Sequence, residues 1–206
     1  MKYDGRMADA QLARVQGEMR RCRRCPDAGF PVQAGAVFSG RAGADWMLVG
    51  QAPGQTESDL GVPFCGPSGR RLFRWLAECG WDEDEFRASS YITAITKCFP
   101  GRATSGRGDR APSRRERLLC RPHLECELRL VRPRAILAVG GAAIEHFLGP
   151  GTLDERVGRT FVADGRVVVP LPHPSGANLW LNRPRSRVLL REALAAIRAV
   201  RDEERP

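Results

Sequence analysis

Lysine and histidine are scarce in this chain of 206 residues, and long apolar runs are missing. Lys2 and Lys97 are its only lysines, and it has three histidines. No stretch is apolar enough to cross a bilayer, and the polar, charged segment from Met1 to Arg24 does not resemble an export signal. Because 42% of the residues are hydrophobic, a disordered chain is also excluded. We therefore expect one cytoplasmic domain spanning residues 1–206, with no membrane partner.

Arginine supplies almost all of the positive charge. The chain has 33 Lys+Arg against 24 Asp+Glu, a formal net charge of +9. The planar guanidinium group can donate two parallel hydrogen bonds to the oxygens of one phosphate. This excess of arginine therefore favours a polyanionic partner such as DNA. A genomic preference for arginine codons is the alternative, and it also fits the many alanines and glycines.

Short apolar runs alternate with amphipathic segments along the chain. Strands are expected at 46–49, 91–96, 135–139 and 167–171, and helices at 8–21, 68–79, 113–131, 142–148 and 187–200. The helix after Ser113 begins with a capping box, in which Glu116 reaches back to the serine. This alternation predicts a three-layer α/β/α fold with a four-stranded parallel sheet. Ligands of such sheets bind at the carboxyl ends of the strands, so the loops there should carry the site.

Seven cysteines without an export signal favour a metal site over a disulfide framework. Cys22 and Cys25 are spaced so that one turn aims two sulfurs at one centre, Cys98 follows the second strand, and Cys120 lies in the capped helix. Four converging thiolates bind an iron-sulfur cluster or a structural zinc ion, and the spacing does not choose between them. Packing in the core accounts for the remaining cysteines, which are Cys65, Cys79 and Cys126.

A segment rich in glycine and proline follows the first strand directly. It reads Gly50-Gln-Ala-Pro-Gly54 and then Gly61-Val-Pro-Phe-Cys-Gly-Pro-Ser-Gly69. With Lys97-Cys98, Cys120-Arg-Pro-His-Leu124 and His173-Pro-Ser175, it resembles the uracil-DNA glycosylase superfamily. The iron-sulfur branches, namely family four, family five and the X-type, are the most similar. The resemblance runs from Cys22 to about Arg187, with the motifs in the family order.

This resemblance implies a monofunctional glycosylase that hydrolyses the N-glycosidic bond of uracil in DNA for base excision repair and leaves an abasic site. It implies the same four-stranded sheet. It also implies that a flipped base stacks on Phe64, while His173 and the backbone N–H groups of Gln51 and Ala52 stabilise the departing anion. In the matching branches a 4Fe-4S cluster is held by four cysteines, which correspond to Cys22, Cys25, Cys98 and Cys120.

Several positions depart from the family patterns. Gln51 stands where family four has glutamate, and Ala52 where family one has its catalytic aspartate, so neither can act as a base. Glu57 is the expected substitute, with Asp59 second; solvated loop charge, or a mechanism without a dedicated base, is the alternative. Ala94 replaces an asparagine that reads the uracil edge, which leaves base specificity open.

Two further positions bear on the base. Gly54 replaces the family-one tyrosine that excludes the thymine methyl group, so 5-substituted uracils are expected to fit. Asn178 belongs to a pattern similar to that of family five and is expected to add a polar contact to the substrate.

Residues 99–112 are predicted to form an exposed, mobile loop. Arg107 and Arg110 are expected to bind DNA phosphates, with a solvated loop as the alternative. The X-type captures its product through a histidine in this region, but Asp109 occupies that position here, so covalent capture is not expected. Leu179 and Trp180 offer an apolar wedge for the gap left by the base, or a buried anchor for the last helix.

Other functions remain open at this point. Gln51, Ala52 and Ala94 are compatible with a DNA- or lesion-binding module that has lost catalysis, and also with a glycosylase for hypoxanthine or xanthine. A zinc-stapled nucleotide-binding domain is the third alternative. The expected partner is DNA, single- or double-stranded, and the expected state is a monomer.

Overall fold

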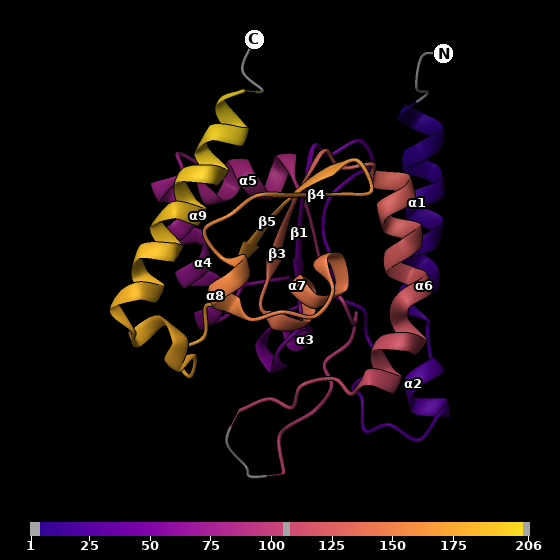
Figure 1. Ribbon diagram of the computed structural model, residues 1–206. Helices are drawn as coiled ribbons and strands as arrows, with labels where there is room; N and C mark the ends of the chain where they lie inside the picture. The colour runs from indigo at the N-terminus through magenta and orange to yellow at the C-terminus, as the bar shows by residue number, and fades with distance from the viewer. Residues whose placement is uncertain (1–4, 105–107, 204–206) are drawn as a thin grey trace.

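A twisted sheet lies at the centre of the computed structural model, which describes residues 5–104 and 108–203 (Figure 1). The strand order is β2-β1-β3-β5-β4. The parallel strands are β1 (Trp46–Gly50), β2 (Tyr91–Ala94), β3 (Ala135–Val139) and β5 (Arg166–Leu171). These are the four strands that the sequence predicts, each within two residues of its expected bounds.

A fifth strand was missed by the sequence prediction. β4 (Phe161–Ala163) pairs antiparallel with β5 and closes one edge of the sheet. The turn between them is tight, with Asp164 and Gly165 both in the left-handed region, at φ 48° and 74°. Three residues are too few to show an alternating pattern, and the one available signal is the Asp164-Gly165 pair between two apolar runs, which is typical of a hairpin turn.

Helices cover both faces of the sheet, as expected for an α/β/α fold (Figure 1). On one face, α1 (Gly5–Arg20) and α6 (Arg114–Val131) lie side by side, with α7 (Gly141–Leu148) near the sheet. The other face carries α4 (Pro67–Glu78), α5 (Glu83–Ser89) and α9 (Pro184–Asp202). The shorter elements are α2 (Arg24–Asp27), α3 (Gln55–Leu60), α8 (Leu153–Arg156) and the 3-10 turn η1 (Leu179–Asn182).

The sheet divides the hydrophobic core in two. Along β1, Leu48 packs toward α4 and α9, whereas Met47 and Val49 pack toward α1, α6 and α7. All of these side chains are fully buried, so the strand is apolar on both faces, as a central parallel strand requires.

The helix α6 presents an unusual buried face. Ser113 caps its first turn through the predicted capping box with Glu116. At intervals of three and four residues that face carries two carboxylates and a thiol among its apolar side chains; the buried residues are Glu116, Cys120, Leu124, Glu127 and Val131. A carboxylate is rarely buried without a partner, so this face must contact cations from other elements.

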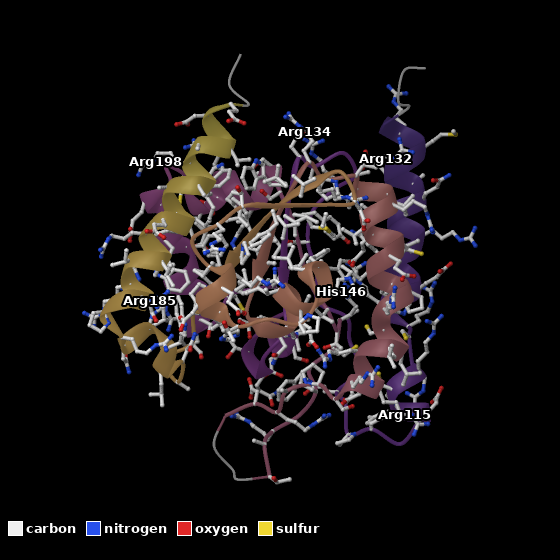
Figure 2. All side chains as sticks on the ribbon, viewed as in Figure 1. Arg115, Arg132, Arg134, His146, Arg185 and Arg198 are labelled. Atoms are coloured by element: carbon white, nitrogen blue, oxygen red, sulfur yellow. The ribbon has the colours of Figure 1, made fainter. Side chains whose placement is uncertain are left out.

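The arginines reach outward over much of the surface (Figure 2). Arg185 and Arg198 project from α9, and Arg115 projects from the start of α6. Within residues 5–104 and 108–203, no helix combines the length and apolar character needed to cross a membrane.

Candidate active site and cysteine cavity

A cavity of about 480 Å³ opens at the carboxyl ends of the parallel strands. Its walls come from the loop after β1, the end of β2, the segment 100–110 and the loop after β5. The loops predicted to meet at this rim therefore do so. The predicted site residues that line the cavity are Gln51, Ala52, Glu57, Phe64, Ala94, Arg110 and His173.

Phe64 is held in an uncommon backbone conformation. Its φ is 53°, in the left-handed region that bulky residues rarely adopt. A methyl group on Gly69 would lie 1.7 Å from the Phe64 carbonyl oxygen, and one on Gly50 would lie 2.8 Å from the ring atom Cζ. Arg87 fixes the same turn, because its guanidinium donates to the carbonyl oxygens of Pro63 and Phe64 over 2.9 and 3.0 Å. The ring is thus a fixed aromatic surface beside the end of β1.

His173 follows β5 at the far side of the cavity. Its Nδ1 accepts a hydrogen bond from the backbone N–H of Ser175 over 3.2 Å, so the proton of the neutral ring lies on Nε2. Burial lowers the pKa of His173, and the negative charge of Glu57 opposes this only in part. The imidazole is therefore neutral near pH 7 and offers one N–H donor to a ligand.

Glu57 lies in α3 and contributes to the cavity floor. Its Oε1 accepts the backbone N–H of Gly66, at the start of α4, over 3.0 Å. Asp59, the second candidate, is exposed and accepts a hydrogen bond from Gln55 over 2.8 Å; it does not line the cavity. The structure therefore favours Glu57 over Asp59 as a site residue.

Gln51 and Ala94 lie where β1 and β2 end. The carbonyl oxygen of Gln51 accepts the backbone N–H of Thr96 over 3.1 Å, which extends the pairing of these strands into the site. The carbonyl oxygen of Ala94 accepts a hydrogen bond from the Lys97 ammonium group over 2.5 Å. These bonds fix the backbone of both residues at the cavity wall.

Asn178, predicted to contact the substrate, does not line the cavity. Its amide donates to the carbonyl oxygen of His173 over 2.8 Å, and its Oδ1 accepts the backbone N–H of Trp180 over 3.2 Å. Asn178 therefore holds the loop that carries His173. Trp180 packs against the core, and its indole N–H donates to Asp154 over 2.7 Å, as expected for a residue that anchors the last helix. Leu179, in contrast, is 75% exposed.

The two ends of the segment 99–112 are anchored to the rest of the protein, whereas Arg102 and Asp109 between them are exposed. Phe99 is buried, and Arg110 donates two hydrogen bonds of 2.7 Å to Glu116 and others to the carbonyl oxygen of Pro100. The guanidinium of Arg110 is thus occupied within the protein, and this geometry does not support its predicted contact with DNA. Arg107 lies outside the described residues.

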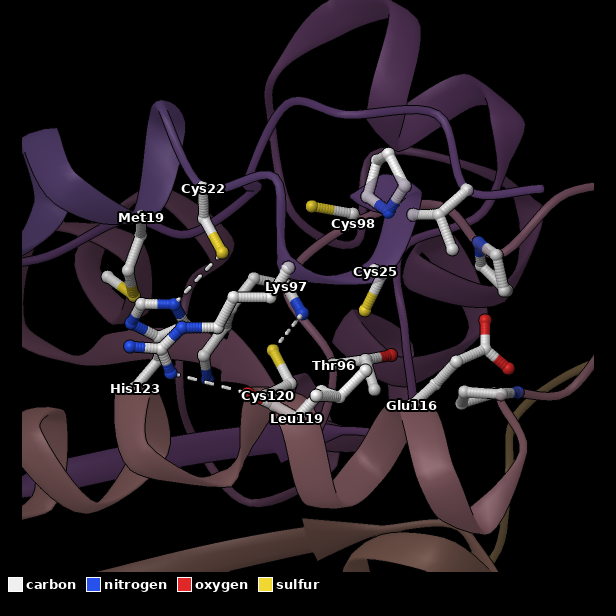
Figure 3. Close-up of a pocket in the computed structure, with 15 residues that line it drawn as sticks. Met19, Cys22, Cys25, Thr96, Lys97, Cys98, Glu116, Leu119, Cys120 and His123 are labelled. Atoms are coloured by element: carbon white, nitrogen blue, oxygen red, sulfur yellow. Dashed lines mark hydrogen bonds between the residues drawn. The ribbon is translucent and has the colours of Figure 1, made fainter. Parts of the chain in front are cut away.

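The four predicted cluster cysteines line a second, smaller cavity (Figure 3). Figure 3 shows the sulfurs of Cys22, Cys25, Cys98 and Cys120 arranged around one centre. Cys22 lies between α1 and α2, Cys25 in α2, Cys98 in the loop after β2, and Cys120 in α6. The backbone N–H of Lys97 donates to the Cys120 sulfur over 3.4 Å, and His123 contacts the Cys22 sulfur over 3.3 Å. Apolar side chains such as Met19 and Leu119 complete the wall.

The chemistry of this donor set fits a bound metal group. Burial, together with the charge of the neighbouring cysteines, raises the pKa of Cys25 to about 11 and that of Cys98 to about 12. Four thiolates at one centre therefore need compensating positive charge, which bound metal supplies. Among the described residues, no three such ligands already converge at single-ion distances. A zinc ion needs sulfurs about 2.3 Å from one point, whereas the ligands of a 4Fe-4S cluster bind separate iron atoms.

Two ion pairs beside these cavities, each with a buried glutamate, were missed by the sequence analysis. Lys97 and Glu127 are 1% and 0% exposed, and their charged groups lie 2.5 Å apart. Thr93 and Tyr91 also donate to Glu127, so the carboxylate is well satisfied. One signal was present: Lys97 is a rare lysine in a chain that otherwise uses arginine, next to a predicted ligand. The other pair, Arg110 with Glu116, was not predicted, because the capping box alone accounts for a glutamate at position 116.

Comparison with known proteins agrees with this arrangement. Residues 38–198 match the family described as the uracil DNA glycosylase superfamily. A type-4 uracil-DNA glycosylase of Sulfurisphaera tokodaii is 26% identical over 197 residues, covering 91% of this chain and 83% of that protein. The type-4 enzyme of Thermotoga maritima is 28% identical over 188 residues, with 89% of each chain covered. Since the family match spans most of its length, this chain belongs to the uracil-DNA glycosylase superfamily.

Proposed function

We propose that this protein is a monofunctional uracil-DNA glycosylase that hydrolyses the bond between uracil and deoxyribose and leaves an abasic site. One observation carries the proposal: the neutral His173 and the fixed ring of Phe64 line the same cavity, of a size that admits a single base. The names of the relatives, type-4 uracil-DNA glycosylase, support the same activity.

The reaction requires the nucleotide outside the duplex, because the sugar carbon is inaccessible within the stack. The extruded base stacks on Phe64. His173 donates its Nε2–H to the base oxygen on which negative charge develops. The hydrogen bond from Ser175 to Nδ1 orients this N–H before the reaction. The exposed Leu179, at the rim beside the His173 loop, enters the gap left in the stack.

We assign Cys22, Cys25, Cys98 and Cys120 as the ligands of a 4Fe-4S cluster. When bound, the cluster would cross-link the segment after α1, the loop after β2 and α6. The hydrolysis itself needs no electron transfer. The buried Lys97 lines the cysteine cavity and donates to Ala94, so these cross-links also fix the end of β2. Ala94 lines the larger cavity, called the base cavity below.

The activity is tested with oligonucleotides that carry one uracil, single-stranded and paired with G or A. Excision appears as a strand break after alkali, and thymine at the same position is the matched substrate control. A shift in mobility without breakage supports a binding module instead. Breakage only at hypoxanthine or xanthine supports a glycosylase for another base.

The cluster is tested on the purified protein by its visible absorbance and its iron and sulfide content. Cys98→Ser is expected to lose both, whereas Cys65→Ser is the control, because Cys65 lies outside the cysteine cavity. A colourless wild-type protein that contains zinc would contradict the assignment.

A further inference from the structure

The base cavity contains a second carboxylate, opposite Glu57. Asp109 lines the cavity from the segment 100–110, and among the described residues no acidic side chain other than these two does so. A methyl group on Gly54 would lie 2.7 Å from Oε2 of Glu57 and 2.9 Å from Oδ2 of Asp109. The two oxygens therefore face one spot at the cavity wall, close enough for a water molecule to bridge them. That spot is also too crowded for a side chain at residue 54.

Asp109 is held in this position by a short hairpin stem. It forms an isolated antiparallel bridge with Arg102, and the backbone N–H of Ala103 donates to Gly108 over 3.1 Å. The Arg102 guanidinium lies 3.7 Å from Oδ1 of Asp109, the oxygen other than the one nearest Gly54. One carboxylate oxygen thus faces a cation, while the other, Oδ2, faces the cavity.

The stem is in turn fixed to the wall of the cysteine cavity. The residue after Asp109 is Arg110, which binds the buried Glu116 through both terminal nitrogens. Glu116 lines the cysteine cavity one turn before Cys120 in α6. The rigid element that carries a predicted cluster ligand therefore also sets the position of Asp109.

We propose that Asp109 is the catalytic residue that holds and deprotonates the attacking water, an inference that rests on the proposed function. The water oxygen forms a bond to the sugar carbon C1′ as the carbon–nitrogen bond breaks, and the bonding electron pair leaves with the base. One water proton passes to Oδ2 of Asp109 and then returns to solvent or to the departing base. The paired negative charges of Asp109 and Glu57 also stabilise the positive charge that develops on the sugar.

Glu57 is less suited to the same role. Its Oε1 is bound to the backbone N–H that begins α4, and this bond helps to place the turn that carries Phe64. Asp109 approaches from a separate wall, and none of its described hydrogen bonds occupies Oδ2. Glu57 is therefore a positioning residue, and Asp109 takes the part that Gln51 and Ala52 cannot perform.

The test is single-turnover excision of uracil by Asp109→Asn and Asp109→Ala. We expect Asp109→Asn to lower the excision rate about 100-fold, the lower range for loss of a general base, with DNA affinity changed less than threefold. Added formate is expected to restore part of the rate of Asp109→Ala, because a small carboxylate fits the space left behind. A purely structural role would not give this recovery. Affinity is measured with an oligonucleotide that carries an uncleavable uridine analogue.

Asp59→Asn is the matched control, since Asp59 is acidic and exposed but does not line the cavity. An Asp109→Asn rate within threefold of the wild type would overturn the inference and leave the proposed function intact. A loss of DNA affinity equal to the loss of rate, without formate recovery, would also overturn it. A wild-type protein that excises no uracil would remove the proposed function and this inference with it.

Discussion

Nδ1 of His173 accepts the backbone N–H of Ser175, two residues further along the same loop. This bond forces the ring proton onto Nε2, and Asn178 fixes the carbonyl oxygen of His173 from the other side. Orientation and tautomer are therefore set by backbone geometry before any ligand arrives. Such preorganised donors are most effective where charge develops during a reaction.

Replacing His173 by alanine is expected to lower the uracil excision rate by 10²- to 10³-fold, as for loss of one donor to a developing anion. Binding of uncleavable DNA should change far less, because the N–H contributes most in the transition state. Single-turnover rates and binding measurements separate the two effects. Equal losses in rate and affinity would contradict the assigned role.

Gly50→Ala is expected to weaken substrate use, because the new methyl group would lie 2.8 Å from the Phe64 ring and displace it. We expect kcat/KM for uracil-containing DNA to fall at least tenfold, with the circular dichroism spectrum of the protein unchanged. Gly17→Ala is the matched control, since its methyl group would meet no atom closer than 3.5 Å. Equal kcat/KM values in both variants would argue against Phe64 as a stacking surface.

Glu116 is expected to make stability depend on acid pH. Burial alone would raise its pKa, but hydrogen bonds from Arg110 and Ser113 lower it from 4.5 to about 2. A carboxyl whose pKa is lower in the folded state stabilises the fold above pH 4.5, and this contribution is lost as the pH falls toward 2. The shift corresponds to about 3 kcal/mol in the free energy of unfolding at pH 7.

Denaturant unfolding of Glu116→Gln, compared with wild type at pH 7 and at pH 3, measures this contribution. The difference between the two proteins should shrink at the lower pH. Glu125→Gln is the control, because Glu125 pairs with Arg121 in the same helix but remains half exposed, and such surface pairs contribute 0–1 kcal/mol. A pH-independent difference between Glu116→Gln and wild type would disprove the assignment.

The parallel strands and the main helices were predictable from the sequence because their apolar runs are long and their ends carry proline, glycine or a cap. Short elements such as β4 and α8 show no periodicity, so only the Asp164-Gly165 turn and the Thr152 capping box indicate them. The motif residues Phe64 and His173 were predicted to share a cavity because each follows a strand of one parallel sheet.

The partners of charged residues could not be predicted in the same way. The contact between Arg110 and Glu116 depends on how Arg110 folds back toward the start of α6, and local sequence does not encode this. For the same reason Asp109 was recognised only as a substituted position, whereas its place in the cavity wall required the structure. Asn178 shows the reverse case, in which a motif match marked a residue that supports the site without lining it.

Lys97 has a practical consequence for following the folded state. It is one of two lysines in the chain and is enclosed almost completely, with its ammonium group against Glu127. Reagents that attack free amines therefore cannot reach it until α6 separates from the sheet. Mass spectrometry of peptides measures how fast Lys97 becomes labelled. That rate reports how often the protein opens between its two cavities.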